Sequence, residues 1–192
     1  MVSVEQFSEL VRAARSCRRY VEADPMPPAL VRRLVDIARL VPSGGNQQPL
    51  RYRIVTDATE RGRVFPYLRW AAALKDWAGP AEGERPTAYI VILSPADKPS
   101  HTDVGIAAQT IQLAATAMGY AACMVGSIDR PAVRHELRLP DDLEIQLIVA
   151  LGRPGEKIVL EELARGGDVS YWRTPDGVHH VPKRRLEDVL IK

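Results

Sequence analysis

A run of six consecutive apolar residues at positions 88–93 constrains the fold of this chain more than any other segment. Such a run, preceded by a polar stretch with proline and glycine at positions 79–86, predicts a strand that is buried in a sheet. Other strand-like runs occupy positions 52–55, 121–125 and 145–151. The sequence therefore predicts a sheet of several strands with one of them buried along its length.

Helical periodicity separates these strands. Apolar residues recur every three to four positions in residues 4–14, where Ser3 can cap the first turn, and in residues 29–41, which Pro42 ends. The other predicted helices cover residues 61–77, 102–118 and 131–137. The segment 102–118 is apolar almost all round, so we expect it to be central and buried. Because helices and strands mix without the strict alternation of a doubly wound sheet, we predict the α+β class.

Composition and charge narrow the class of protein. With 192 residues, of which 46% are hydrophobic, the chain is long enough for a single domain with its own core over residues 1–192. Its net charge of +2 is too small, and its basic residues too interleaved with acids, to indicate nucleic-acid binding. The sequence shows neither a secretory signal nor the run of about 18 apolar residues that a membrane helix needs. We expect a cytoplasmic protein that binds no membrane.

The two cysteines, Cys17 and Cys123, are far apart in the sequence and predict neither a disulfide framework nor a metal site. The adjacent pair His179 and His180 does not share one helix face, so we interpret it as structural.

The C-terminal extension, residues 158–192, is polar and irregular in pattern and has too few apolar residues for a core of its own. Its apolar residues include Tyr171, Trp172, Val178, Val181, Leu186, Val189, Leu190 and Ile191. They are most simply explained by packing against another surface, either that of the same chain or that of a partner subunit.

The segment from Pro42 to Pro49, Pro-Ser-Gly-Gly-Asn-Gln-Gln-Pro, joins a predicted helix to a predicted strand. Carboxamides both donate and accept hydrogen bonds, and glycines let the backbone approach a ligand closely. This density of small and carboxamide residues indicates a loop that binds a flat heterocycle with polar edges. The alternative is an ordinary turn rich in glycine and asparagine.

A cluster of basic residues precedes this loop at positions 15–20, Arg-Ser-Cys-Arg-Arg-Tyr. Guanidinium groups and a hydroxyl are the groups that hold a phosphate. The alternative is a charged surface exposed to water, which is the usual fate of such a run.

Together, the arginine cluster and the Pro42–Pro49 loop resemble the paired motifs of the nitroreductase family. The resemblance continues through residues 103–109, 118–126 and 151–154 and covers nearly the whole chain. It implies a mixed, mainly antiparallel sheet flanked by helices, in a homodimer with FMN at the interface. It also implies NAD(P)H as electron donor and, by ping-pong hydride transfer, the reduction of nitroaromatic, quinone or related electron-poor small molecules.

The resemblance assigns cofactor-binding roles residue by residue. The positions are Arg15, Ser16, Arg18, Pro42, Ser43, Gly44, Asn46, Gln48, Met124, Val125, Gly126, Lys183 and Arg184. For Gln48 the alternative is support of the loop itself, and for Lys183 and Arg184 it is an exposed basic tail. Cys17 occupies a variable position of its motif and is expected to pack. No residue is assigned as acid, base, nucleophile or metal ligand, and residues 61–86 and 171–172 are expected to shape the pocket.

Other functions stay open at this point. Iodotyrosine deiodinases and a flavin-fragmenting enzyme of cobamide synthesis resemble this chain too, and no residue signature assigns it to either. A flavin-binding protein without turnover, for storage or regulation, is a further alternative. The chain lacks the glycine pattern of a Rossmann site, a Walker loop and a nucleophile elbow.

Overall fold

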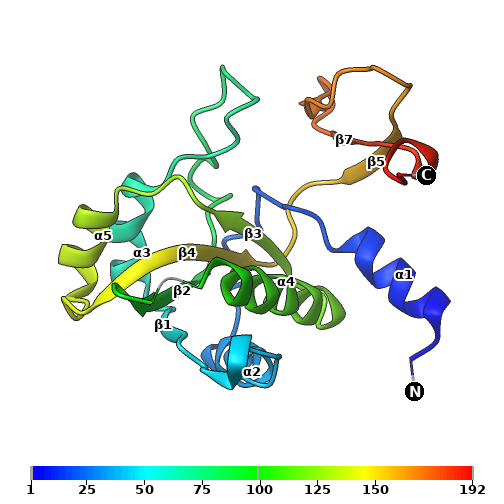
Figure 1. Cartoon of the computed structure of the whole chain (residues 1–192). Helices are drawn as coiled ribbons and strands as arrows, with labels where there is room; N and C mark the ends of the chain where they lie inside the picture. Colours follow the sequence, from blue (N-terminus) through cyan, green and yellow to red (C-terminus); the bar gives the residue numbers. More distant parts are fainter. Residues whose placement is uncertain (1, 99, 192) are drawn as a thin grey trace.

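The computed structural model describes residues 2–98 and 100–191. A four-stranded antiparallel sheet forms its centre, with the strand order β1-β2-β4-β3 (Figure 1). The strands are β1 (Arg51–Val55), β2 (Ala88–Pro95), β3 (Ala121–Val125) and β4 (Leu143–Gly152). The apolar run 88–93 lies in β2, between β1 and β4, and every residue of that run is buried. The prediction of a buried strand is confirmed.

Helices cover both faces of the sheet. Helices α2 (Pro28–Ala38) and α4 (His101–Ala117) lie on one side of it (Figure 1) and form one hydrophobic core with it. Helices α3 (Ala58–Val64) and α5 (Arg130–Leu137) contribute to a second hydrophobic core on the other side. Because successive side chains of a strand point to opposite faces, Ile90 of β2 packs in the core with α2 and α4, whereas Val91 packs in the core with α3 and α5. The α+β prediction is confirmed.

Three predicted elements differ from the structure. The helix expected over residues 61–77 ends at Val64 and passes into a 3₁₀ turn, η2 (Phe65–Tyr67). Pro66 has no backbone N–H to continue the helical ladder, and an irregular loop follows up to β2. The helix expected over 29–41 ends at Ala38. Helix α4 is central but buried on one face only, and Ile106 on its other face is 37% exposed.

The C-terminal extension is more regular than its pattern suggested. It forms a second, three-stranded sheet in the order β5-β7-β6, followed by a 3₁₀ turn, η3 (Leu186–Asp188). The strands are β5 (Ile158–Glu162), β6 (Trp172–Arg173) and β7 (His179–Lys183). Backbone pairing holds this sheet, with β5 parallel to β7, although few of its side chains are fully buried.

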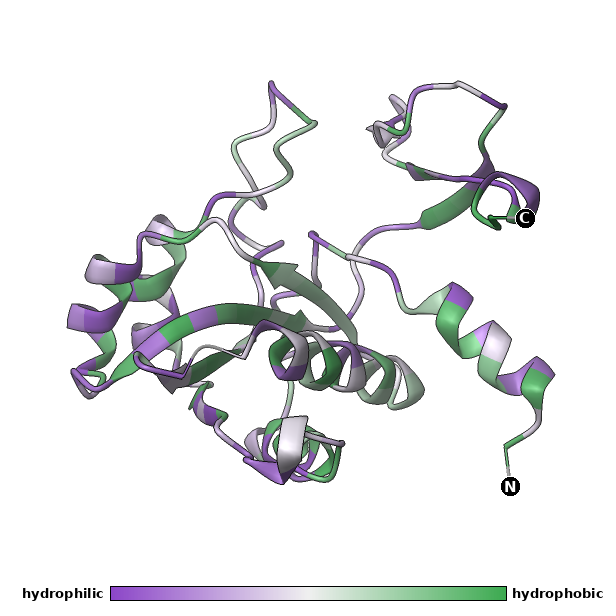
Figure 2. Ribbon diagram, viewed as in Figure 1, coloured by the Kyte–Doolittle hydropathy of each residue, from purple (hydrophilic) through white to green (hydrophobic). Residues whose placement is uncertain are grey.

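Helix α1 (Val4–Ala13) projects from the body of the molecule (Figure 1). Ser3 caps it as predicted, since its hydroxyl accepts a hydrogen bond from the Gln6 N–H at 3.2 Å. No residue of α1 is buried, and Phe7 is 52% exposed. Figure 2 shows hydrophobic positions along α1 and near the C-terminus. Near the C-terminus, the side chains of Leu186 and Val189 are exposed. None of the described helices has the length and apolar character needed to cross a membrane.

Candidate functional site

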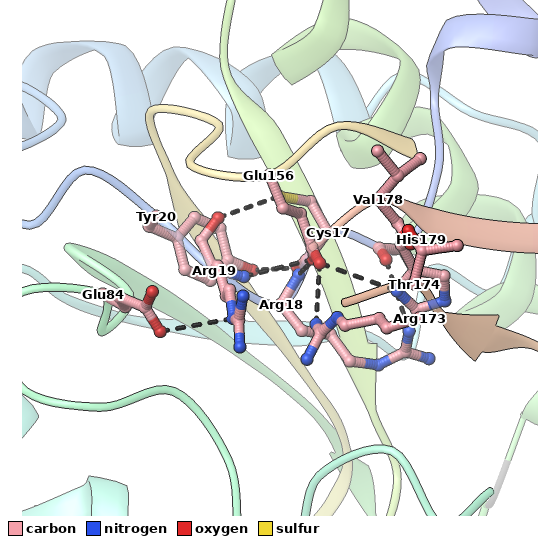
Figure 3. A network of polar contacts seen from close by, with 11 residues as sticks. Cys17, Arg18, Arg19, Tyr20, Glu84, Glu156, Arg173, Thr174, Val178 and His179 are labelled. Carbon is pink, nitrogen blue, oxygen red and sulfur yellow. Dashed lines mark hydrogen bonds and ion pairs between the residues drawn. The ribbon is translucent and has the colours of Figure 1, made fainter. Parts of the chain in front are cut away.

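The arginine cluster follows α1 as an extended segment that is fixed to the central sheet. Ser16 forms a parallel bridge with Ala122 of β3, and the Cys17 N–H donates to the Ala122 carbonyl at 3.0 Å. The side chain of Tyr20 is buried, and its hydroxyl donates to the Cys17 carbonyl at 2.7 Å (Figure 3). The buried side chains of Cys17 and Tyr20 anchor the segment. The backbone that carries Arg15, Arg18 and Arg19 is therefore held at the edge of the sheet.

Two guanidinium groups of this cluster lack an acidic partner. Arg19 forms an ion pair with Glu84 at 3.3 Å, whereas neither Arg15 nor Arg18 pairs with a carboxylate within residues 2–98 and 100–191. The Arg15 Nη2 donates to the Val11 carbonyl at 2.6 Å, while its buried Nε has no hydrogen-bond partner in the described chain. Partial burial lowers the pKa of Arg15. A buried donor without a partner is costly, so this position suits an anionic ligand.

Arg18 lies at a hollow of about 200 Å³, which we call the arginine hollow. Its other lining residues are Arg69, Trp70, Ala71, Ala72, Cys123, Met124, Val125, Gly126, Ser127 and Tyr171. The structure therefore brings together Arg18 and the end of β3 at residues 124–126, two groups that the resemblance assigns to cofactor binding. The guanidinium of Arg18 lies 4.8 Å from the centre of the Tyr171 ring. Residues 69–72 and Tyr171 belong to the segments that were expected to shape the pocket.

The Pro42–Pro49 loop is anchored by an aspartate. The Ser43 hydroxyl donates to Asp103 Oδ2 at 2.6 Å, and the Gly44 N–H donates to Asp103 Oδ1 at 3.1 Å. Asp103 is 4% exposed, and the hydrogen bonds from Ser43 and then Gly44 lower the pKa of its carboxyl group. Sequence reasoning did not assign Asp103 to the site. The available signal was a carboxylate in the first turn of a predicted helix, where the helix dipole favours it.

The backbone of this loop is unusual. Gly45, Asn46 and Gln48 all have left-handed φ values, of 54°, 54° and 49°, although only glycine adopts this region at little cost. The Gln48 side-chain amide donates to the Asn46 carbonyl at 3.2 Å and to its side-chain oxygen at 3.1 Å. Gln48 thus supports the loop, which is the alternative role considered for it. Non-glycine residues held in this conformation indicate a shape that the surrounding contacts fix.

Pro42, Ser43 and Gln48 line a second hollow of about 220 Å³, which we call the loop hollow, together with Asp103 and the end of α2. The two hollows share no lining residue. Each is smaller than the 300–1,000 Å³ that is typical of small-molecule sites. In a single chain, the loop and the arginine cluster thus lie at two separate hollows.

Lys183 and Arg184 line neither hollow. Both side chains are exposed where β7 ends, and the Lys183 carbonyl accepts a hydrogen bond from the Leu163 N–H at 2.8 Å. The chain does not bring them beside the arginine cluster through any described contact.

The thiols of Cys17 and Cys123 are both buried, and neither is expected to be reactive. Burial raises the pKa of Cys17 to about 12 and that of Cys123 to about 11. The Cys17 thiol donates to the Arg19 carbonyl at 3.1 Å. Since the thiolate is the reactive form, the two cysteines act as packing residues.

The profile of the nitroreductase family matches residues 11–153, which include the arginine cluster, the loop and the whole central sheet. This chain belongs to the nitroreductase family. Among curated proteins it is similar to 5,6-dimethylbenzimidazole synthase of Rhodospirillum rubrum, with 27% identity over 174 residues that cover 78% of this chain and 82% of the relative.

Solved structures show the same fold. A Desulfovibrio desulfuricans protein described as a nitroreductase, in complex with FMN, aligns with a TM-score of 0.68 at 22% identity over 96% of this chain and 95% of that chain. The FMN-dependent nitroreductase NfnB of Mycobacterium smegmatis, solved in complex with NADPH, aligns with a TM-score of 0.62 at 22% identity over 80% of this chain and 90% of that chain. The prediction of a nitroreductase-like sheet flanked by helices is confirmed.

Proposed function

We propose that this protein is an FMN-dependent oxidoreductase that uses NAD(P)H to reduce an electron-poor small molecule. The observation that carries the proposal is the pair of guanidinium groups of Arg15 and Arg18 at the edge of the central sheet, which have no acidic partner in the part of the chain that the structure describes. An anionic, flat cofactor fits this site because the buried Arg15 Nε has no acceptor among the described residues, and the end of β3 offers backbone beside Arg18.

The residues of the chain would divide the work of holding FMN. Arg15 and Ser16 would bind the phosphate, and Arg18 would place its charge at the polar edge of the ring, where a cation favours the reduced, anionic form. The backbone of Met124, Val125 and Gly126 would orient the ring. Bound FMN would supply the hydride chemistry, with NAD(P)H as donor and a nitroaromatic or quinone as acceptor in ping-pong order.

The second half of the site would come from a partner subunit. Neither hollow alone has the volume of a small-molecule site, and α1 and the C-terminus carry uncovered apolar side chains. A homodimer in which Ser43, Gly44 and Asn46 of the partner's loop meet the arginine cluster would account for both observations. An isologous two-fold dimer would then hold two FMN molecules. Pro42 and Gln48 would support that loop, and Lys183 or Arg184 would complete the phosphate site.

The cofactor and the activity are tested on the purified protein. We expect it to be yellow, to release FMN rather than FAD on denaturation, and to oxidise NADH or NADPH when a quinone or nitroaromatic acceptor is supplied. Chromatography of the released flavin and a steady-state assay of nicotinamide oxidation check both points. FAD, or the absence of flavin even after FMN is added, would contradict the cofactor assignment. Bound FMN without nicotinamide oxidation would indicate a storage or regulatory protein.

The similarity to 5,6-dimethylbenzimidazole synthase favours a second candidate, in which the flavin is itself fragmented. The two candidates differ in the fate of FMN. Mass spectrometry after aerobic incubation with FMN and NAD(P)H distinguishes them. An oxidoreductase would leave FMN intact over many turnovers, whereas a flavin-fragmenting enzyme would consume FMN and release 5,6-dimethylbenzimidazole.

A further inference from the structure

Glu156 is an almost fully buried acid that neither the resemblance nor the sequence pattern assigns to the site. Its side chain is 1% exposed and lies just after the central sheet, before β5. The carboxylate accepts hydrogen bonds from the backbone N–H groups of Arg18, at 2.5 Å, and Arg19, at 3.2 Å (Figure 3). A buried carboxylate is costly unless it is paired and hydrogen-bonded, and here its partners come from the segment that carries Arg18.

The other partners of Glu156 come from the C-terminal sheet. Arg173 of β6 donates from Nη2 to Glu156 Oε2 at 2.7 Å, and His179 Nδ1 of β7 lies 3.6 Å from the same oxygen (Figure 3). The side chains of Arg173 and His179 are 10% and 0% exposed. One carboxylate thus joins the arginine cluster to two strands that are distant in sequence from it.

The charge of Glu156 is strongly stabilised. Burial alone would raise the pKa of Glu156, but the His179 ring, the Arg18 N–H and the Arg173 guanidinium lower it to about 2. A carboxyl group whose pKa falls on folding contributes stability above its ordinary pKa, and loses that contribution as the pH decreases. For Glu156 this loss extends from about pH 4.5 to about pH 2, so the network is intact at neutral pH.

A second contact ties the same sheet to the arginine hollow. Tyr171, which comes two residues before Arg173, places its ring under the Arg18 guanidinium at 4.8 Å. Arg173 itself lies 4.2 Å from the centre of the Trp77 ring. The C-terminal sheet therefore contacts the backbone of the arginine cluster through Glu156 and the Arg18 side chain through Tyr171.

We propose that Glu156 is a positioning residue of the flavin site, which fixes the backbone that carries Arg18 and links it to the docked C-terminal sheet. This inference rests on the proposed function, since the group to be positioned is the flavin-binding arginine. Its consequence is reciprocal coupling: docking of β6 and β7 favours flavin binding, and bound flavin favours the docked sheet.

The test compares Glu156→Gln with a matched control in β5 of the C-terminal sheet, Glu162→Gln. Glu162 also pairs with an arginine, Arg185, at 3.0 Å, but both side chains are largely exposed. Both variants lose one negative charge. We expect Glu156→Gln to weaken FMN binding about tenfold or more, since the negative charge that strengthens the hydrogen bonds from the Arg18 and Arg19 N–H groups is lost. Glu162→Gln should stay within about twofold of the wild type.

A second readout separates positioning from general stability. Hydrogen exchange, followed by mass spectrometry over residues 172–180, reports docking of β6 and β7. In the wild type, FMN should slow exchange in this region; in Glu156→Gln, exchange should be faster and FMN should no longer slow it. Arg173→Met leaves in place the hydrogen bonds that Glu156 accepts from the Arg18 and Arg19 N–H groups. It should show fast exchange with a smaller loss of FMN affinity than Glu156→Gln.

The outcomes distinguish this inference from the proposed function. If the wild type binds no FMN, the proposed function fails. If the wild type binds FMN and a folded Glu156→Gln variant binds it equally well, with unchanged protection of residues 172–180, the positioning role is wrong. Should Glu156→Gln not fold, Arg173→Met decides: wild-type FMN affinity together with FMN-dependent protection of residues 172–180 would overturn the coupling.

Discussion

Replacing Arg18 by alanine should lower the affinity for FMN by roughly 10- to 100-fold, because a charge-assisted contact contributes about 1.5–3 kcal/mol. Arg15→Ala should have a similar effect. Neither side chain pairs with a carboxylate in the described part of the chain, so the apo-proteins should unfold at nearly the wild-type denaturant concentration. Fluorescence titration with FMN and urea unfolding of the apo-protein measure the two effects separately.

The matched control for these variants is Arg12→Ala. Arg12 lies in the last turn of α1, three residues before Arg15, and its side chain is exposed. The substitution removes the same positive charge as Arg15→Ala and Arg18→Ala do. It should leave FMN affinity within about twofold of the wild type, since an exposed charge at a distance is screened. If Arg15→Ala and Arg18→Ala both bind FMN as the wild type does, the arginine cluster is only a charged surface.

Gly155→Ala should lower the free energy of unfolding by about 3 kcal/mol through overpacking. A Cβ at this position would lie 2.8 Å from the Tyr20 carbonyl carbon and 3.0 Å from its Cα. The neighbouring backbone cannot easily move away, because the Tyr20 N–H donates to the Glu84 carbonyl and the Tyr20 side chain is buried. Urea unfolding of the apo-protein measures the change.

Gly62→Ala is the control, and its effect should have the opposite sign. Gly62 lies within α3, and a Cβ there would meet nothing within 4 Å. Alanine should stabilise this helix by about 0.5–1 kcal/mol, because glycine loses more backbone entropy on folding. If Gly155→Ala unfolds at the same urea concentration as the wild type, the backbone around Tyr20 can move away from the added Cβ, and the prediction for Gly155 is wrong.

The elements that the sequence predicted well are those that local pattern determines. Residues 121–125 form β3 with the expected bounds, and the apolar run 88–93 forms the first six residues of β2. The helix over 61–77 was wrong because its periodicity continues past Pro66, while the chain instead packs Leu68 and Trp70 into the core as an irregular segment. Tertiary burial there overrides local propensity.

The C-terminal sheet was missed for a different reason. Its parallel pair, β5 and β7, joins segments about 20 residues apart, with Ile158 opposite His179. Neither strand has a long apolar run, so pairing that depends on backbone hydrogen bonds leaves little trace in the sequence pattern.

The candidate site shows the same division. Arg18 and residues 124–126 were assigned through motifs and do line one hollow. Asp103 and Glu156 were missed because their roles depend on partners across the fold: Asp103 holds Ser43 from 60 positions away, and Glu156 holds Arg18 from 138 positions away. An acid in a helix turn or a loop has no local signature for such contacts.

The most direct test of a shared flavin site uses two defective variants in one dimer. The first is Arg15→Ala/Arg18→Ala, and the second is Ser43→Ala/Asn46→Ala. We expect homodimers of either variant to bind FMN weakly, because each removes one half of every site. The two variants are co-expressed with different affinity tags, and the heterodimer is isolated through both tags.

The measurement is the number of FMN molecules bound per heterodimer. If the arginine cluster of one chain meets the loop of the other, one site combines both sets of substitutions and the second site is intact. The account therefore predicts one tightly bound FMN per heterodimer, against two per wild-type dimer. A heterodimer that binds no FMN tightly, like its parents, would show that both halves of the site belong to the same chain and would contradict the shared site.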